Sequence, residues 1–327
     1  MSLSKPIRRI AVIGTGITGS SWAALYLARG FDVIAMDPAP NAESNLRRYV
    51  DTAWQALARL GLSPKASPQH LDFIPDLARA VHGADFIQES GPEHEECKVC
   101  LFADMDAAAP PDSIIASSSS GLAMSVIQSA CNHPDRCVIG HPFHLPHLTP
   151  LVEVVGGVNT SPEAIRRAIS FYDSIGRKPI QLRREIAGHA ANRLQAALYR
   201  EIASLIEQDV LSVTDADTAV CWGPGLHWGA MGPNLFHVAG GQGGIRLFLE
   251  KIAGLIDGKW NELGNAKLTP QLQQTIVQGV LQEIGNRSLE QLARERDEML
   301  LGLLRLRTNA AKASGSSRKT ARNSKKR

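Results

Sequence analysis

A glycine-rich turn between two strand patterns opens this chain and constrains its fold more than any other segment. Residues 10–13 (IAVI) form a short, bulky apolar run, which is typical of a strand buried on both faces. Glycines then recur in a Gly-x-Gly-x-x-Gly pattern at Gly14, Gly16 and Gly19, and an apolar helical pattern begins at Trp22. This order of strand, glycine turn and helix predicts the first unit of a parallel, doubly wound sheet.

The same unit predicts a dinucleotide site. Gly14 permits the tight turn, Gly16 lets a pyrophosphate approach the backbone, and Gly19 lets helix and strand pack closely, while the helix N-terminus offers N–H groups to the anion. A second strand pattern, residues 32–36, ends at Asp37, where an acid binds a ribose and repels a 2′-phosphate. We therefore predict NAD as the cofactor; the alternative is a plain turn with a solvated Asp37.

Length and composition bound the class of protein. A chain of 327 residues exceeds what one hydrophobic core usually supports, which predicts two domains. No apolar stretch has transmembrane length and the first residues lack a signal-peptide core, so we expect a soluble, cytoplasmic protein. Five cysteines without framework spacing fit a reducing compartment. The isolated CxxC of Cys97 and Cys100 is interpreted as ordinary packing rather than a metal or redox site.

The last segment, residues 308–327, differs in charge from the rest of the chain. From Lys312 onward it holds seven lysines or arginines and no acid, and without them the formal net charge changes from +3 to −4. We interpret it as a disordered basic tail on a mildly acidic body. Because most such tails are solvated ends, we predict no nucleic-acid partner.

Strand and helix patterns alternate along the first part of the chain, which predicts a Rossmann-type, doubly wound, mostly parallel sheet. No strand pattern remains afterwards, and helical patterns follow one another. We therefore predict an NAD-binding domain at residues 1–186 and an all-helical substrate and dimerisation domain at residues 187–307. The predicted strands are residues 10–13, 32–36, 71–74, 84–88, 113–116, 137–140, 151–155 and 179–182, and the longer helices include residues 42–60, 97–109, 162–175 and 187–209.

A histidine and a glutamate stand at two of these strands. His141 directly follows strand 137–140, and Glu153 lies inside the apolar run LVEVV. Ligands of open parallel sheets bind beyond the carboxyl ends of the strands, and a buried acid needs a polar partner. An imidazole can remove the hydroxyl proton of an alcohol while a carboxylate fixes its tautomer. The pair points to alcohol oxidation, although the spacing alone also fits a loop histidine and an edge-strand acid.

Longer motifs make the chain resemble the L-3-hydroxyacyl-CoA dehydrogenase superfamily over roughly residues 7 to 250. These motifs are QESGPEHEECK, ASSSSGL, GHPF followed by LVEVV, and ANRLQAALYREIASLIEQDV, in addition to the dinucleotide turn. Among its branches the chain is most similar to that of L-carnitine dehydrogenase and gulonate dehydrogenase, which includes lambda-crystallin. The resemblance implies NAD-dependent oxidation of a secondary alcohol.

The resemblance also implies roles for single residues. His141 would be the general base in oxidation and the general acid in reduction, with Glu153 orienting it. Ser120 and Asn192 would hydrogen-bond the reacting oxygen of the substrate and hold it near the hydride acceptor. Taken without the family pattern, Ser120 is one serine of a polar run and Asn192 a residue on a helix surface.

Two further residues, Glu93 and Lys98, are implied at the nicotinamide end of the cofactor. The chain departs from the family at His144, which stands where the pattern HxFNP has its asparagine. An imidazole differs in length from an asparagine side chain, so the contact that the family's asparagine makes to the nicotinamide or substrate would differ here. The spacing of His141, His144 and His147 invites a metal assignment. Because that loop is broken by prolines and the family needs no metal, we predict none.

The sequence motifs indicate a class of substrate. Motifs shared with the branch that acts on free hydroxy acids favour a small, carnitine-like L-3-hydroxy acid, and Trp228 is a candidate for cation–π contact with its quaternary ammonium. Packing at a domain interface is the alternative role of Trp228. A short-chain L-3-hydroxyacyl-CoA dehydrogenase is the second hypothesis, and a non-catalytic NAD-binding protein of the crystallin type is the third. The family further implies a homodimer.

Overall fold

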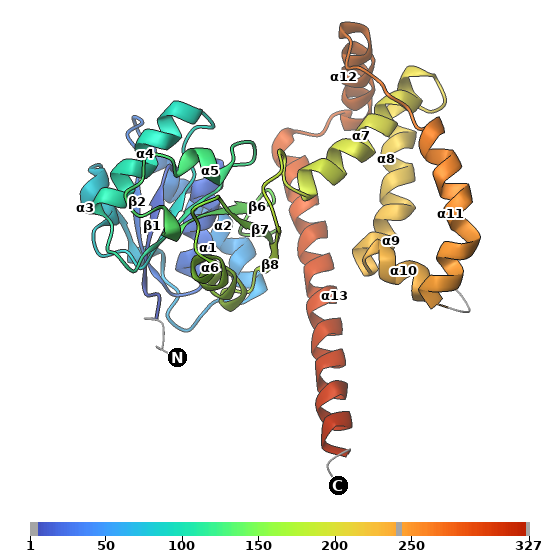
Figure 1. Cartoon of the computed structure of the whole chain (residues 1–327). Coiled ribbons are helices and arrows are strands. Elements are labelled where there is room, and N and C mark those ends of the chain that lie inside the picture. Colours follow the sequence, from blue (N-terminus) through green and yellow to red (C-terminus); the bar gives the residue numbers. More distant parts are fainter. Residues whose placement is uncertain (1–5, 240–243, 325–327) are drawn as a thin grey trace. The chain divides into compact units, whose positions relative to one another are not determined.

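The computed structural model describes residues 6–239 and 244–324 and divides the chain into two compact units, Met1–Asn192 and Arg193–Arg327. The first unit is an eight-stranded sheet with helices on both faces, and the second is built from helices throughout its described residues (Figure 1). The predicted fold class is confirmed. The predicted domain boundaries at residues 186 and 307 stay predictions.

The sheet has the strand order β3-β2-β1-β4-β5-β6-β7-β8. Every neighbouring pair is parallel except β6 and β7, which are antiparallel. Their connection, residues 143–150, is too short for the crossover that a parallel pair requires. The strands are β1 Arg9–Ile13, β2 Asp32–Met36, β3 Leu71–Phe73, β4 Phe86–Glu89, β5 Ile114–Ser117, β6 Cys137–Pro142, β7 Leu151–Gly156 and β8 Lys178–Gln181.

Helices cover both faces of this sheet and form two separate cores. One core contains the stacked rings of Trp22 and Tyr26, and the other contains Phe102 and Met105. The apolar residues of β1 are buried against both cores, as the continuous run at residues 10–13 predicts. The first core is covered by α1 Ile17–Ala28, α2 Ala42–Leu60 and α6 Pro162–Ser174, and the second by α3 Leu77–Val81, α4 Glu95–Ala108 and α5 Met124–Ile127.

Seven helices account for the regular structure described after the sheet. They are α7 Ala191–Glu207, α8 Val213–Trp222, α9 Pro224–Ala230, α10 Pro233–Ala239, α11 Gly244–Glu262, α12 Pro270–Ile284 and α13 Leu289–Ser324. The last helix continues beyond residue 307 into the segment interpreted above as a disordered tail, where alanine, lysine and arginine favour helix. None of the helices described is long and apolar enough to cross a membrane.

The start of α7 differs from the prediction in a way that matters for the site. The amphipathic pattern predicts a helix from residue 187, whereas α7 begins at Ala191. Gly188 and His189 precede it with φ of +75° and +48°, a left-handed conformation that a right-handed helix cannot contain. A tight turn therefore replaces the first predicted helical turn, and the N-terminal N–H groups of α7 lie at residues that the sequence pattern places inside a helix.

Candidate active site

The glycine turn has the geometry of a dinucleotide cradle. Gly14 has φ of +87°, and a Cβ there would lie 2.7 Å from the backbone nitrogen of Gly91. A Cβ on Gly19 would lie 1.8 Å from the carbonyl oxygen of Gly14, whereas a Cβ on Gly16 would meet nothing within 4 Å. Gly16 is also the N-cap of α1, which has no side-chain cap and no acid in its first turn. The open space and the N–H groups facing it fit a pyrophosphate.

Asp37 follows the end of β2, next to this turn. Its Oδ2 accepts hydrogen bonds from the Thr15 backbone nitrogen at 2.6 Å and the Thr15 hydroxyl at 3.1 Å, and its Oδ1 accepts one from the Ala39 nitrogen at 2.9 Å. Each carboxylate oxygen can accept a further bond. The carboxylate is thus fixed beside the cradle where an adenosine ribose would bind, and its charge disfavours a 2′-phosphate.

A buried ion pair stands at the carboxyl ends of β4 and β5. The Lys98 ammonium lies 2.7 Å from Glu89 Oε1 and 3.3 Å from the Gly91 carbonyl oxygen, and both charged side chains are fully buried. The Ser117 hydroxyl donates to Glu89 Oε2 at 2.5 Å. The ammonium also reaches Glu93 Oε2 at 3.7 Å. Lys98 therefore fixes the loop that leads from β4 to α4.

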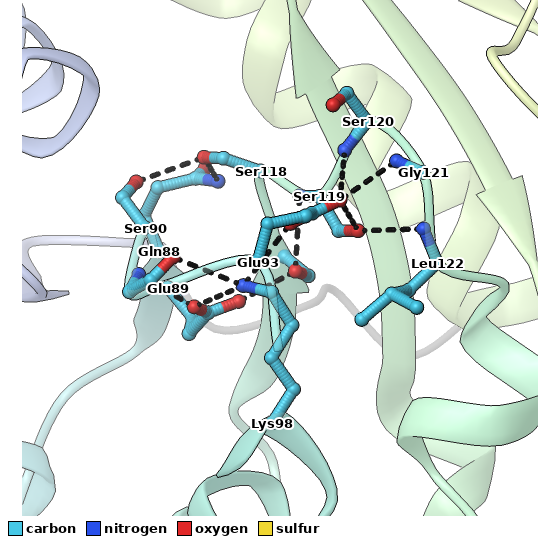
Figure 2. Close-up of polar contacts among 12 residues, drawn as sticks. Gln88, Glu89, Ser90, Glu93, Lys98, Ser118, Ser119, Ser120, Gly121 and Leu122 are labelled. Atoms are coloured by element: carbon cyan, nitrogen blue, oxygen red, sulfur yellow. Dashed lines mark hydrogen bonds and ion pairs between the residues drawn. The ribbon is translucent and has the colours of Figure 1, made fainter. Parts of the chain in front are cut away.

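The carboxylate of Glu93 binds the serine-rich turn that follows β5 through hydrogen bonds (Figure 2). Its Oε1 accepts hydrogen bonds from the Ser119 hydroxyl at 2.6 Å and from the backbone nitrogens of Gly121 at 2.7 Å and Ser120 at 3.0 Å. Burial acts to raise the pKa of Glu93, but these hydrogen bonds and the charge of Lys98 outweigh it and hold the pKa below its usual value. An ionised Glu93 thus sets the position of the turn that carries Ser120.

His141 and Glu153 form a buried hydrogen-bonded pair. They are directly opposite in the register of β6 and β7, and His141 Nδ1 lies 3.0 Å from Glu153 Oε2. The side chain of Glu153 is fully buried and that of His141 is 7% exposed. Strand β6 extends to Pro142, so His141 lies within the strand instead of following it.

The second oxygen of Glu153 binds the start of α7. Oε1 accepts hydrogen bonds from the backbone nitrogens of Ala190 at 2.8 Å and Ala191 at 3.1 Å. Burial acts to raise the pKa of Glu153, but the hydrogen bonds from His141, Ala190 and Ala191 keep it below the usual value. Asn192 is the next residue along the helix and belongs to the same compact unit. The carboxylate thus anchors the segment that carries Asn192.

His189 connects this pair to the serine turn. Its ring centroid lies 4.7 Å from that of His141, and its Nε2 lies 3.0 Å from the carbonyl oxygen of Ser119. A carbonyl can only accept, so Nε2 carries the proton. Burial lowers the pKa of His189, which keeps the ring neutral. Ser119 and His141 therefore share one neighbour, and the turn bearing Ser120 is tied to the His141–Glu153 pair.

The remaining predicted residues have no hydrogen bond to this network among those the structure describes. His144 is exposed, and its carbonyl oxygen accepts from the Thr149 hydroxyl. The His147 ring is buried and bonds the Ser21 hydroxyl at 2.8 Å, so it contacts a different partner from His141. Trp228 belongs to the second unit, on α9, and is 44% exposed.

The sequence patterns do not predict two residues of this hydrogen-bonded network, Glu89 and His189. Glu89 directly follows the predicted strand 84–88 and ends β4 in the structure, and an acid that closes an apolar strand signals a buried partner. His189 was placed inside a helix, and its only signal is the Gly188–His189 pair, since glycine favours a left-handed turn.

The arrangement can hold a dinucleotide and move a proton. The cradle at Gly16 and the carboxylate of Asp37 fit the pyrophosphate and a ribose. With Glu153 ionised, the proton of neutral His141 lies on Nδ1, which leaves Nε2 free to accept a proton from a bound molecule. Hydride transfer from an alcohol needs both features, a dinucleotide site and a group that can accept a proton.

Known proteins match this chain over most of its length. Residues 9–186 match the family described as 3-hydroxyacyl-CoA dehydrogenase, NAD binding domain. An L-carnitine dehydrogenase from Pseudomonas putida is 44% identical over 299 residues, which cover 91% of this chain and 93% of that protein. Another from Bacillus cereus is 42% identical over 301 residues, covering 92% of each chain. A solved NAD+-dependent 5-formyl-3-hydroxy-2-methylpyridine 4-carboxylic acid 5-dehydrogenase matches with a TM-score of 0.79 and 29% identity, over 92% of this chain and 98% of that one.

Proposed function

The chain belongs to the 3-hydroxyacyl-CoA dehydrogenase family of NAD-dependent enzymes, and from this premise we propose that it oxidises the 3-hydroxyl group of L-carnitine, or of a closely similar small 3-hydroxy acid, to the ketone. The observation that carries the proposal is the buried hydrogen bond between His141 Nδ1 and Glu153 Oε2. Bound NAD supplies the hydride acceptor.

His141 is the base in this proposal. Its Nε2 takes the proton of the substrate hydroxyl while a hydride leaves the carbon that bears this hydroxyl. The alcohol thereby becomes a ketone and the imidazole becomes an imidazolium. The carboxylate of Glu153 stabilises that cation and holds the ring in the productive tautomer. In the reverse direction the same nitrogen returns the proton to the ketone oxygen.

Ser120 and Asn192 position the reacting oxygen in this proposal. Both residues follow backbone that the network holds rigidly, because Glu93 binds the Ser120 nitrogen and Glu153 binds the nitrogens just before Asn192. A hydroxyl and an amide N–H fixed in this way stabilise the charge that develops on the oxygen. Lys98 acts indirectly, by holding the loop that carries Glu93.

Small free hydroxy acids are favoured as substrates over the two alternatives. Relatives named L-carnitine dehydrogenase align with more than nine tenths of the chain, whereas a short-chain 3-hydroxyacyl-CoA dehydrogenase would need a site for the CoA phosphates. A non-catalytic NAD-binding protein of the crystallin type has no need of a hydrogen-bonded, buried His141 and Glu153.

The test is the NAD-dependent rise in absorbance at 340 nm with L-carnitine and L-3-hydroxybutyryl-CoA assayed in parallel. We expect turnover of L-carnitine and little of the CoA ester. Turnover of the CoA ester alone would show that the proposed substrate is wrong, while the proposed proton and hydride transfer would stand. Tight NADH binding without turnover of either compound would contradict the proposal.

The variant H141Q tests the base. Glutamine keeps the size and polarity of the side chain but cannot accept a proton, so we expect turnover to fall by about 10²–10⁴-fold while NADH still binds. Unchanged turnover would remove His141 from the mechanism.

We also propose that the protein is a cytoplasmic homodimer that pairs through its helical unit. Large apolar side chains are exposed on those helices, among them Trp222, Trp260 and Leu306 at 75%, 65% and 69%. Exposed apolar area of this kind is usually covered by a partner. Light scattering after size exclusion should give the mass of two 35.3 kDa chains, and a monomer would contradict the dimer.

A further inference from the structure

A small pocket adjoins the candidate active site within the first unit. Its volume is about 230 Å³, below the roughly 300 Å³ at which pockets begin to hold whole drug-sized ligands, so it suits one end of a small molecule. His189, whose ring packs on that of His141, forms part of its wall. Its apolar wall includes Leu122, Met124, Ile139 and Val155. We call it the Leu122 pocket.

One carboxylate, that of Glu185, lines the Leu122 pocket. Its Oε1 accepts a hydrogen bond from the Ser125 nitrogen at 2.9 Å, and its Oε2 accepts one from the Ser125 hydroxyl. The carboxylate of Glu185 is therefore held in place at the pocket wall by Ser125, and no basic side chain in the described part of the chain pairs with it.

The other polar side chain in the wall is also an acceptor. His189 is 4% exposed, and because its Nε2 donates to the Ser119 carbonyl, its Nδ1 carries a lone pair. Nδ1 is buried and has no hydrogen-bond partner within the described part of the chain. The Gly121 nitrogen, a donor near the pocket, is already bound by Glu93. The side chains of the Leu122 pocket thus offer a negative charge, a lone pair and apolar carbon.

We propose that the Leu122 pocket binds the quaternary ammonium end of the substrate and that Glu185 selects for this cation. A trimethylammonium group has an apolar surface and a positive charge but no N–H to donate, so it matches apolar walls and an unneutralised carboxylate. A carboxylate end would be repelled by Glu185. The inference rests on the proposed function, which it deepens by assigning the two ends of the substrate.

The test compares two ligands that differ only in charge. Calorimetry with the full chain and NAD measures binding of 4-(trimethylammonio)butanoate and of 5,5-dimethylhexanoate, in which carbon replaces the nitrogen. Neither has a 3-hydroxyl, so neither is oxidised. We expect E185Q to weaken binding of the ligand with the trimethylammonium end by on the order of tenfold or more, and binding of the ligand with the uncharged tert-butyl end by less than about twofold. These two are called the cationic and the neutral ligand after that end. E185D, which keeps the charge, should retain most of the preference.

The controls separate this inference from its alternatives. E163Q removes the same charge from exposed residue Glu163 on α6 and should change neither affinity. Equal effects of E185Q on both ligands, or no effect, would overturn the inference, as would a loss of cation preference in W228A but not in E185Q. Oxidation of L-carnitine by the wild type is measured separately, so the proposed function can stand while the role of Glu185 fails.

If E185Q does not fold, the affinities of the wild type and of E185D for the two ligands still test the inference. Similar affinities of the wild type for the cationic and the neutral ligand would show that the pocket is an apolar recess without charge selection. A cation preference lost in E185D despite its retained charge would also count against Glu185.

Discussion

His141 and Glu153 face each other across the one antiparallel pair of the sheet, β6 and β7, with 3.0 Å between Nδ1 and Oε2. The register of two hydrogen-bonded strands therefore sets the distance between the imidazole and the carboxylate, and the loop that joins the strands does not. A site built on strands is held more rigidly than one built on loops. The second oxygen of Glu153 extends this rigidity to the first residues of α7.

Exchange of the carboxylate for an amide should impair turnover without unfolding the site. In E153Q the side chain keeps its size, but a neutral amide neither stabilises the imidazolium of His141 nor fixes its tautomer. We expect kcat to fall by about 100-fold or more. NADH affinity, measured by fluorescence, should stay within about twofold. A matched loss of NADH affinity would show that Glu153 supports the fold of the site and not the proton transfer.

Local patterns predicted most of the sheet unit. The helix α2 has the predicted bounds, residues 42–60, because its buried residues Leu46, Val50 and Leu57 recur at helical spacing. The first strand was recognisable because residues 10–13 are apolar without interruption. The family resemblance is confirmed by the match over residues 9–186.

The network around the site could not be predicted in the same way, because it joins distant segments. Glu93 meets Ser119 from another loop, and the pairing of β6 with β7 depends on the direction of both strands. The turn before α7 escaped prediction because an amphipathic pattern continues through it, while the left-handed conformation of His189 has no periodic signal. The residue roles stay predictions.

Two glycines of the cradle should respond differently to alanine. A methyl group at Gly16 would lie more than 4 Å from any other described residue beyond its two neighbours in the chain, so G16A should fold normally but obstruct the pyrophosphate and weaken NADH binding by about tenfold or more. At Gly19 the methyl group would lie 1.8 Å from a carbonyl oxygen, so G19A should also lose about 1–3 kcal/mol of stability. Thermal denaturation and NADH titration of both variants check this. Wild-type NADH affinity in G16A would contradict the cradle.

His189 should act as a positioning residue. H189N keeps a residue type that tolerates positive φ but removes the ring beside His141 and the hydrogen bond to the Ser119 carbonyl. We expect kcat to fall by about tenfold, with the KM for NAD nearly unchanged because Glu93 still holds the serine turn. Steady-state kinetics separate the two parameters. Unchanged kcat would remove His189 from the positioning of His141.

The buried ion pair of Asp106 and Arg136 should make the stability of the fold depend on pH in acid. Asp106 on α4 accepts two hydrogen bonds at its Oδ1 from the guanidinium of Arg136, at 3.0 and 2.8 Å. Its Oδ2 accepts hydrogen bonds from the backbone nitrogens of Asn132 and His133, which precede β6, the strand that contains His141. Burial acts to raise the pKa of Asp106, but Arg136 and the backbone bonds outweigh it and lower the pKa. D106N leaves a buried guanidinium unpaired and should cost about 3 kcal/mol at pH 7.

The pH dependence follows from the direction of that shift. Because the pKa of Asp106 is lower in the folded than in the unfolded chain, its stabilisation is complete above the unfolded pKa, about 3.9, and is lost as the pH falls through the folded value. Urea denaturation should therefore show a gap between wild type and D106N that is widest near pH 7 and narrows below about pH 4. D51N, at an exposed position on α2, should show no comparable gap. A gap that persists unchanged below pH 3 would mean that D106N destabilises the chain through packing and not through the lost charge.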